Sequence, residues 1–187
     1  MTQCVRSRWL ASAIAALAIA GGPGGQSVTA TDVFALAGLQ VPTLTQQSYD
    51  ELETFFGPVG GSYRNPIDSA GPVRRDMKRV MNIVARDPQI DNLVYFVSTK
   101  PGWHLQPQQL KGAMDILSSL KENSGKPLMV VSLFHNPDAE KETREVMRQI
   151  QEMGIPVFPS FERCASALRN VLSYHQKRGS GPKSKAY

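Results

Sequence analysis

Residues 13–25 read Ala-Ile-Ala-Ala-Leu-Ala-Ile-Ala-Gly-Gly-Pro-Gly-Gly, an apolar run that ends in four glycines and a proline. A strand buried on both faces of a parallel sheet has such a continuous apolar sequence rather than an alternating one. After the turn, Ser27 or Thr29 is placed to cap a helix, and Gly38 is placed to end it. The stretch therefore predicts a buried strand over residues 13–20, a glycine turn and a helix.

The same stretch also has features of a secretory signal peptide. Arg6 and Arg8 precede the apolar run from Trp9 to Ala20, and small residues follow it. The low strand propensity of alanine favours this alternative. The capped helix that follows favours the strand, because a signal peptide has no reason to be followed by one. Twelve residues are too few for a membrane span.

Helical and strand-like segments alternate along the rest of the chain. Tyr63 to Asp68 is expected to be extended around its proline, because the residue before a proline avoids the helical region. Strands separated by helices predict a single α/β domain, a flavodoxin-like doubly wound parallel sheet in three α/β/α layers. Helices are predicted at 48–56, 73–85, 108–123, from 136–138 onward and at 160–174; strands are predicted at 92–97, 128–134 and 157–158, with an extended piece at 39–44.

The positive charge of the chain is concentrated near its ends. The formal net charge is +5 and the sequence pI is about 9.4. Removing the six basic residues near the ends leaves 15 basic against 16 acidic residues, so residues 11–176 carry a net charge of −1. A nucleic-acid-binding face needs clustered Lys and Arg, so we expect no nucleic-acid partner and no membrane association. The six are Arg6, Arg8, Lys177, Arg178, Lys183 and Lys185.

Ligands of doubly wound folds bind beyond the carboxyl ends of the strands. Four loops are predicted there, at 21–27, 65–70, 98–104 and 135–138. The first is the best candidate, because glycines before a helix let backbone N–H groups approach an anion at the positive helix end. It matches neither a Walker A loop nor the Gly-x-Gly-x-x-Gly spacing of dinucleotide sites. A tight turn without a ligand remains the alternative.

The histidines and cysteines indicate no catalytic or metal site. His104 and His135 fall in predicted strand-end loops, either near a ligand or in solvent, whereas His175 is expected on the surface of the last helix. No Ser-His-Asp arrangement and no metal-ligand spacing is present. Cys4 and Cys164 are too few for a disulfide framework, and Cys164 is expected to pack as a small apolar residue.

Five short motifs occur in a characteristic order over residues 13–175. In this order they resemble the second flavodoxin-like, CoA-ligase domain of ADP-forming (NDP-forming) acyl-CoA synthetases, relatives of succinyl-CoA synthetase. This resemblance assigns the N-terminal run to the first strand and implies a cytoplasmic protein. The motifs are Ala18-Ile19-Ala20-Gly21-Gly22-Pro23-Gly24-Gly25 continuing to Ala37-Gly38-Leu39, Asn65-Pro66-Ile67-Asp68, Asp87-Pro88 with Asp91, Lys126-Pro127, and Gly154-Ile155-Pro156-Val157-Phe158 before an Ala- and Leu-bearing helix.

The resemblance implies a reaction and a site. Members of this family interconvert an acyl-CoA, phosphate and ADP with an acid, CoA and ATP through an acyl phosphate and a phosphohistidine. Asn65 and Asp68 are expected to shape the turn beside the site, and no residue of this chain is expected to be catalytic. The anion cradle implied by the resemblance comprises Gly22, Gly24, Gly25, Gln26 and Ser27, with Ser98 and Thr99 in a second loop.

The chain departs from the family in what it lacks. None of its histidines lies in a Ser-His-Thr-Gly-like or Gly-His-Ala-Gly-like loop, the setting of the phosphohistidine, and 187 residues leave no room for the Rossmann CoA-binding and ATP-grasp domains. We therefore expect residues 13–176 to form a synthetase domain between an N-terminal extension (1–12) and a disordered basic tail (177–187). Partner domains would supply CoA, ADP or ATP and Mg²⁺. The alternative is a non-catalytic module that binds a small anion or a protein.

Overall fold

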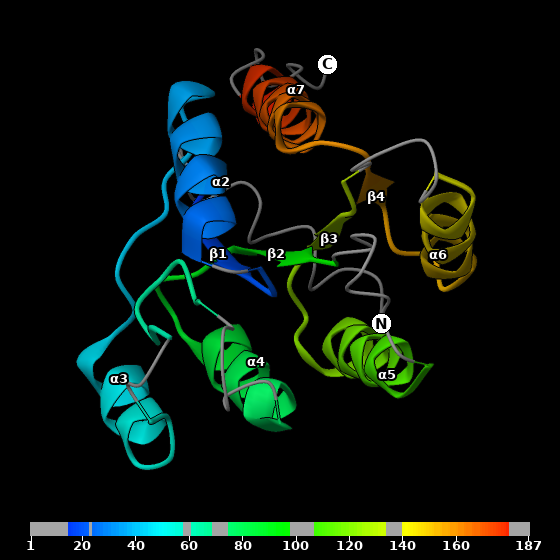
Figure 1. Cartoon of the computed structure of the whole chain (residues 1–187). Coiled ribbons are helices and arrows are strands. Elements are labelled where there is room, and N and C mark those ends of the chain that lie inside the picture. The colour runs from blue at the N-terminus through cyan, green and yellow to red at the C-terminus, as the bar shows by residue number, and fades with distance from the viewer. Residues whose placement is uncertain are drawn as a thin grey trace.

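A parallel four-stranded sheet forms the centre of the molecule, with the strands in the order β1-β2-β3-β4 (Figure 1). The computed structural model describes residues 15–22, 24–57, 61–68, 75–97, 107–133 and 140–179. The strands are β1 (Leu17–Ala20), β2 (Asn92–Phe96), β3 (Leu128–Val131) and β4 (Val157–Phe158). The helices are α2 (Gly24–Leu36), α3 (Gln46–Glu53), α4 (Met77–Arg86), α5 (Pro107–Asn123), α6 (Glu140–Glu152) and α7 (Phe161–Gly179).

The segment after α2 returns to the outer edge of β1 and pairs there through a single residue. Gln40 forms a parallel bridge with Ala16. The N–H of Leu17 donates to the carbonyl of Gln40 at 2.8 Å, and the N–H of Gln40 donates to the carbonyl of Ala15 at 3.2 Å. The chain thus places its second extended segment on one side of β1 and β2 on the other. This is the strand arrangement of flavodoxin-like folds, so the predicted fold class is confirmed.

Helices cover both faces of the sheet. In β1, Leu17 and Ile19 pack in the core cluster of α2 and α7, while Ala18 and Ala20 belong to the cluster of α3, α4, α5 and α6. Figure 1 shows α2 and α7 together on one face, with α4 and α5 on the other. Because side chains alternate along a strand, a strand covered on both faces is apolar throughout, as the 13–25 stretch predicted.

Helix α2 begins earlier than the sequence predicts, but it ends at the predicted position. Its first residue is Gly24, so Ser27 lies inside the first turn, and the prediction that Ser27 or Thr29 caps the helix is wrong. The Thr29 hydroxyl instead donates to the carbonyl of Gly25 at 3.1 Å. At the other end Gly38 has a φ of 75°, and its N–H donates to Ala35 while Leu39 donates to Phe34. This is a Schellman cap, and the prediction for Gly38 is confirmed.

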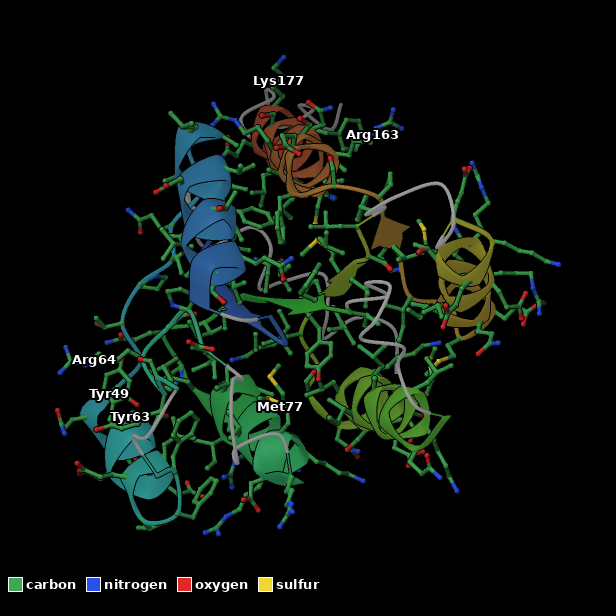
Figure 2. The ribbon with its side chains drawn as sticks, viewed as in Figure 1. Tyr49, Tyr63, Arg64, Met77, Arg163 and Lys177 are labelled. Carbon is green, nitrogen blue, oxygen red and sulfur yellow. The ribbon has the colours of Figure 1, made fainter. Side chains whose placement is uncertain are left out.

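The turn over residues 62–68 lies beside α3. Ser62 and Asp68 pair in an antiparallel bridge, so the segment folds back on itself and the prediction of an extended segment is wrong. The ring of Tyr63 packs edge-on against those of Tyr49 and Phe56, with centroids 5.9 and 5.5 Å apart. Figure 2 shows Tyr49 and Tyr63 next to one another. These aromatic contacts fasten the turn to α3.

The sheet ends at β4, which has only two residues. Pro156 and Pro159 flank it on either side. Helix α7 follows and continues to Gly179, so residues 177–179 are helical where the sequence predicted the beginning of the tail. The predicted N-terminal extension over residues 1–12 lies outside the described residues.

Candidate functional site

The glycine turn lies at the carboxyl end of β1, next to the end of β2. Gly21 has a φ of +99°, a conformation that side chains rarely adopt. A Cβ atom at Gly21 would lie 2.3 Å from the carbonyl oxygen of Phe96, and one at Gly22 would lie 2.9 Å from the Phe96 ring. The two backbones therefore approach so closely that only glycine fits at Gly21. Phe96 was not among the predicted site residues, although it is an aromatic residue at the end of a predicted buried strand, which is a signal that could have identified it.

Gly24 and Gly25 differ in the space that a side chain would have. A Cβ atom at Gly24 would lie 2.6 Å from the Oδ2 atom of Asp68, whereas one at Gly25 would meet nothing within 4 Å. Gly24 is the first residue of α2, where free N–H groups and the helix dipole favour negative charge. The carboxylate of Asp68 is thus adjacent to the positive end of this helix. The side of the helix start at Gly25 remains open.

Asn65 joins the 62–68 turn to β1. Its side-chain amide donates to the carbonyls of Leu17 and Pro42, both at 2.7 Å, and its Oδ1 atom accepts from the N–H of Ile19 at 3.1 Å. Two residues later, the N–H of Ile67 donates to the carbonyl of Ile19 at 2.8 Å. The Asn65 side chain therefore makes hydrogen bonds to the outer edge of β1 that a neighbouring strand would otherwise make, beyond the point where pairing with Gln40 stops.

Two side-chain oxygen atoms in the first turn of α2 are buried and unpaired among the described residues. The Oε1 atom of Gln26 and the hydroxyl of Ser27 have no hydrogen-bond partner among the described residues. Ser27 is only 5% exposed. A buried polar atom without a partner costs about 1–3 kcal/mol, so such groups usually have a partner that is a ligand, water or another chain.

Four other candidate residues lie on predicted loops that the structure does not describe. Ser98, Thr99, His104 and His135 lie outside the described residues. His175 lies on α7, where its ring contacts Tyr174 with centroids 5.5 Å apart.

Cys164 is fully buried on α7. Burial raises the pKa of its thiol to about 12. The thiol is therefore protonated at neutral pH, and the prediction that Cys164 packs as a small apolar residue is confirmed.

Within the described ranges, no group of three or more His, Cys, Asp or Glu residues is arranged to hold a metal ion. Within the same ranges, every helix is too short or too polar to cross a bilayer.

Comparison with known proteins identifies relatives in sequence. No family model matches the chain. It is 27% identical over 170 residues to the alpha subunit of ADP-forming acetate–CoA ligase II from Pyrococcus furiosus, covering 90% of this chain and 35% of that subunit. It is 26% identical over 155 residues to the alpha subunit of ADP-forming acetate–CoA ligase I from the same organism, covering 81% of this chain and 31% of that subunit.

Solved structures show the same fold. A Pyrococcus horikoshii protein matches with a TM-score of 0.67 and 23% identity, over 91% of this chain and 37% of the other. The dinucleotide-forming acetyl-coenzyme A synthetase 1 of Ca. Korarchaeum cryptofilum, in complex with phosphate and ADP, matches with a TM-score of 0.66 and 22% identity, over 92% and 36% of the two chains. The chain spans about a third of the length of the relatives it matches. It is similar in sequence to alpha subunits of ADP-forming acetate–CoA ligases and similar in fold to an acetyl-coenzyme A synthetase. The resemblance inferred from its motifs is therefore confirmed.

Proposed function

We propose that this chain is a domain or subunit of an ADP-forming acyl-CoA synthetase and that it needs partner domains for turnover. In the proposed reaction, phosphate attacks the acyl carbon of an acyl-CoA and the CoA thiolate leaves. The resulting acyl phosphate gives its phosphoryl group to a histidine of another domain and releases the acid. That histidine passes the phosphoryl group to ADP, forming ATP. The similarity to acetate–CoA ligase alpha subunits over 90% of the chain supports this assignment.

The proposed site lies at the start of α2. The proposed cradle consists of Gly22, Gly24, Gly25, Gln26 and Ser27, with Ser98 and Thr99 of the loop after β2 as its second wall. Backbone N–H groups at a helix start stabilise a transferring phosphoryl group without a charged side chain. The open side at Gly25 gives an anion access, and the unpaired oxygen of Gln26 and hydroxyl of Ser27 lie in the same turn.

Asp68 sets how tightly this cradle holds an anion. Its carboxylate lies beside Gly24, so it satisfies the positive helix end while repelling a second negative charge. The chain alone is therefore expected to bind phosphate weakly. In the complete enzyme, cations of the partner domains or Mg²⁺ bound with ADP would offset this repulsion. We assign CoA, ADP or ATP and Mg²⁺ to Rossmann CoA-binding and ATP-grasp partners.

A coupled assay tests the assignment. The chain is mixed with ADP, Mg²⁺, phosphate and acetyl-CoA, with and without the phosphohistidine-bearing and ATP-grasp components encoded in the same genome. ATP is expected to form only when the chain and its partners are combined. If adding the chain brings no gain over the partners alone, the proposed function is wrong.

Phosphate binding to the chain alone tests the cradle, with phosphorus NMR line width as the readout. Gly24→Asp adds a second carboxylate at the helix start and is expected to abolish binding. Asp68→Asn removes the first and is expected to strengthen binding about two- to fivefold. Gly57→Asp is the matched control, because it adds the same charge at an open position after α3. Equal weakening by Gly24→Asp and Gly57→Asp would exclude the glycine cradle.

A second candidate function is a non-catalytic module that binds a small anion or a protein. Asp68 favours it, because a carboxylate of the chain itself already meets the positive end of α2. The two candidates differ in the coupled assay. A non-catalytic module would bind phosphate with the same variant dependence and would add no turnover.

A further inference from the structure

A concave site lies at the amino-terminal end of the sheet, away from the glycine turn. It is a groove of about 600 Å³ between α4 and the carboxyl-terminal half of α5, and it reaches Glu51 of α3. Three basic residues and one acidic residue line it: Arg79, Arg86, Lys126 and Glu51. All the lining residues belong to the described ranges, and the net charge of the lining is positive.

Part of the polar lining is occupied by contacts within the chain. Arg86 pairs with Glu51 at 3.1 Å, and its Nε atom donates to the carbonyl of Asn82 at 3.2 Å. The Asn123 amide donates to the carbonyl of Ser119 at 2.9 Å, and the Lys126 ammonium donates to the carbonyl of Asp87. These donors bind carbonyls in the last turns of α4 and α5 and before β2. The negative ends of the two helices are therefore neutralised by the chain itself.

The groove also contains hydrogen-bond donors that have no partner within the described ranges. The guanidinium of Arg79 lies 3.8 Å from the centroid of the Phe55 ring, which fixes its position through a cation–π contact. No hydrogen bond or ion pair within the described ranges occupies the guanidinium of Arg79, the side-chain amide of Asn82 or the hydroxyl of Ser119. A held guanidinium with an open donor edge, an amide and a hydroxyl form a set that suits an oxyanion.

The lining also includes apolar residues. Ile83 and Leu120 are only 2% and 1% exposed, so they form the floor of the groove beneath the polar groups. A groove of about 600 Å³ that carries basic and neutral donors has room for an organic anion rather than a bare inorganic one. We propose that this groove binds a small phosphorylated organic molecule, with its phosphate on Arg79, Asn82 and Ser119 and its organic part along the rest of the groove. The site is separate from the glycine cradle and does not depend on the proposed synthetase function.

Proton–nitrogen NMR on the whole chain tests this site with ribose 5-phosphate as the probe and ribose as the uncharged control. Saturable shifts are expected in residues 79–86 and 119–126 with ribose 5-phosphate only. Arg79→Gln is expected to weaken binding about tenfold or more, because it removes a charge-assisted contact. Ser119→Ala, which leaves Arg79 on Phe55, is expected to weaken it about two- to tenfold.

The controls separate this site from general charge and from the glycine turn. Arg163→Gln removes one positive charge from the outside of α7, on the opposite face of the sheet (Figure 2), and is expected to leave binding unchanged. Equal weakening by Arg163→Gln and Arg79→Gln would overturn the proposal. Shifts confined to residues 20–27, or the absence of saturable shifts, would overturn it too.

Discussion

The two ends of the sheet are stabilised by different means. At the carboxyl end, Gly21 and Gly24 bring the backbone against Phe96 and Asp68, and contact depends on the absence of a side chain. At the amino end, buried or half-buried carboxylates accept hydrogen bonds from backbone N–H groups. Asp87 accepts from the N–H and hydroxyl of Thr45, both at 2.8 Å, and Asp91 accepts from the N–H of Ala16 at 3.2 Å.

This difference separates the end where backbone N–H groups are proposed to bind an anion from the end where buried or half-buried carboxylates hold the fold together. Acidic side chains at the amino end accept hydrogen bonds from backbone groups that pairing leaves unsatisfied. At the carboxyl end, glycines keep side chains away from the N–H groups that a ligand needs. Substitutions at the two ends are therefore expected to differ in size and in pH dependence.

The largest effect is expected at Gly21. Gly21→Ala places a Cβ atom 2.3 Å from a backbone oxygen and forces alanine to a φ of +99°. Strain and overpacking together are expected to lower the free energy of unfolding by about 3–5 kcal/mol, measured by urea denaturation. Gly25→Ala is the matched control and is expected to change it by less than about 1 kcal/mol, because its Cβ has open space. Equal losses in both variants would contradict the close packing at Gly21.

The next effect is expected at Asn65. Asn65→Ala removes three hydrogen bonds and leaves backbone groups of β1 unpaired. We expect a loss of about 2–3 kcal/mol in the free energy of unfolding. Gln46→Ala removes an exposed side-chain hydrogen bond to Asp50 and is expected to cost less than about 0.5 kcal/mol. A loss at Asn65 as small as at Gln46 would show that water replaces the side chain along β1.

The amino end is expected to respond to pH. Burial alone raises the pKa of the Asp87 carboxyl, but hydrogen bonds from Ser48, Thr45 and Gln89 outweigh it and hold that pKa below its ordinary value. The stabilisation is therefore complete above the ordinary pKa and is lost as the pH falls through the lower, folded value.

Urea denaturation across acidic pH measures this effect. Asp87→Asn is expected to cost about 1 kcal/mol at neutral pH and to flatten the decline in stability at acidic pH. Asp50→Asn, on the exposed side of α3, is the control and is expected to retain the decline. If the stability of the Asp87→Asn variant declines as steeply at acidic pH as that of the unsubstituted chain, other carboxyls cause the decline.

The fold was predictable because its strands are apolar apart from Asn92 at the start of β2, and its helices end at clear signals. The Schellman cap at Gly38 is one such signal, since its residues are neighbours in sequence. The start of α2 was misplaced, because Ser27 and Thr29 are residue types that favour a cap, whereas the helix already begins at Gly24. Likewise, the contact of Asp68 with Gly24 and the bonds of Asn65 to β1 join segments more than 40 residues apart, which sequence periodicity does not encode.

The prolines beside β4 restrict how the molecule can assemble. An exposed strand edge invites a strand of another chain to extend the sheet, but Pro156 and Pro159 lack N–H donors, and only two residues lie between them. The opposite edge, outside β1, is already occupied by Gln40, Asn65 and Ile67. Neither side offers a template for continuous sheet formation. Association with a partner domain is therefore expected to use helix surfaces and loops, which also limits sheet-to-sheet aggregation of the folded chain.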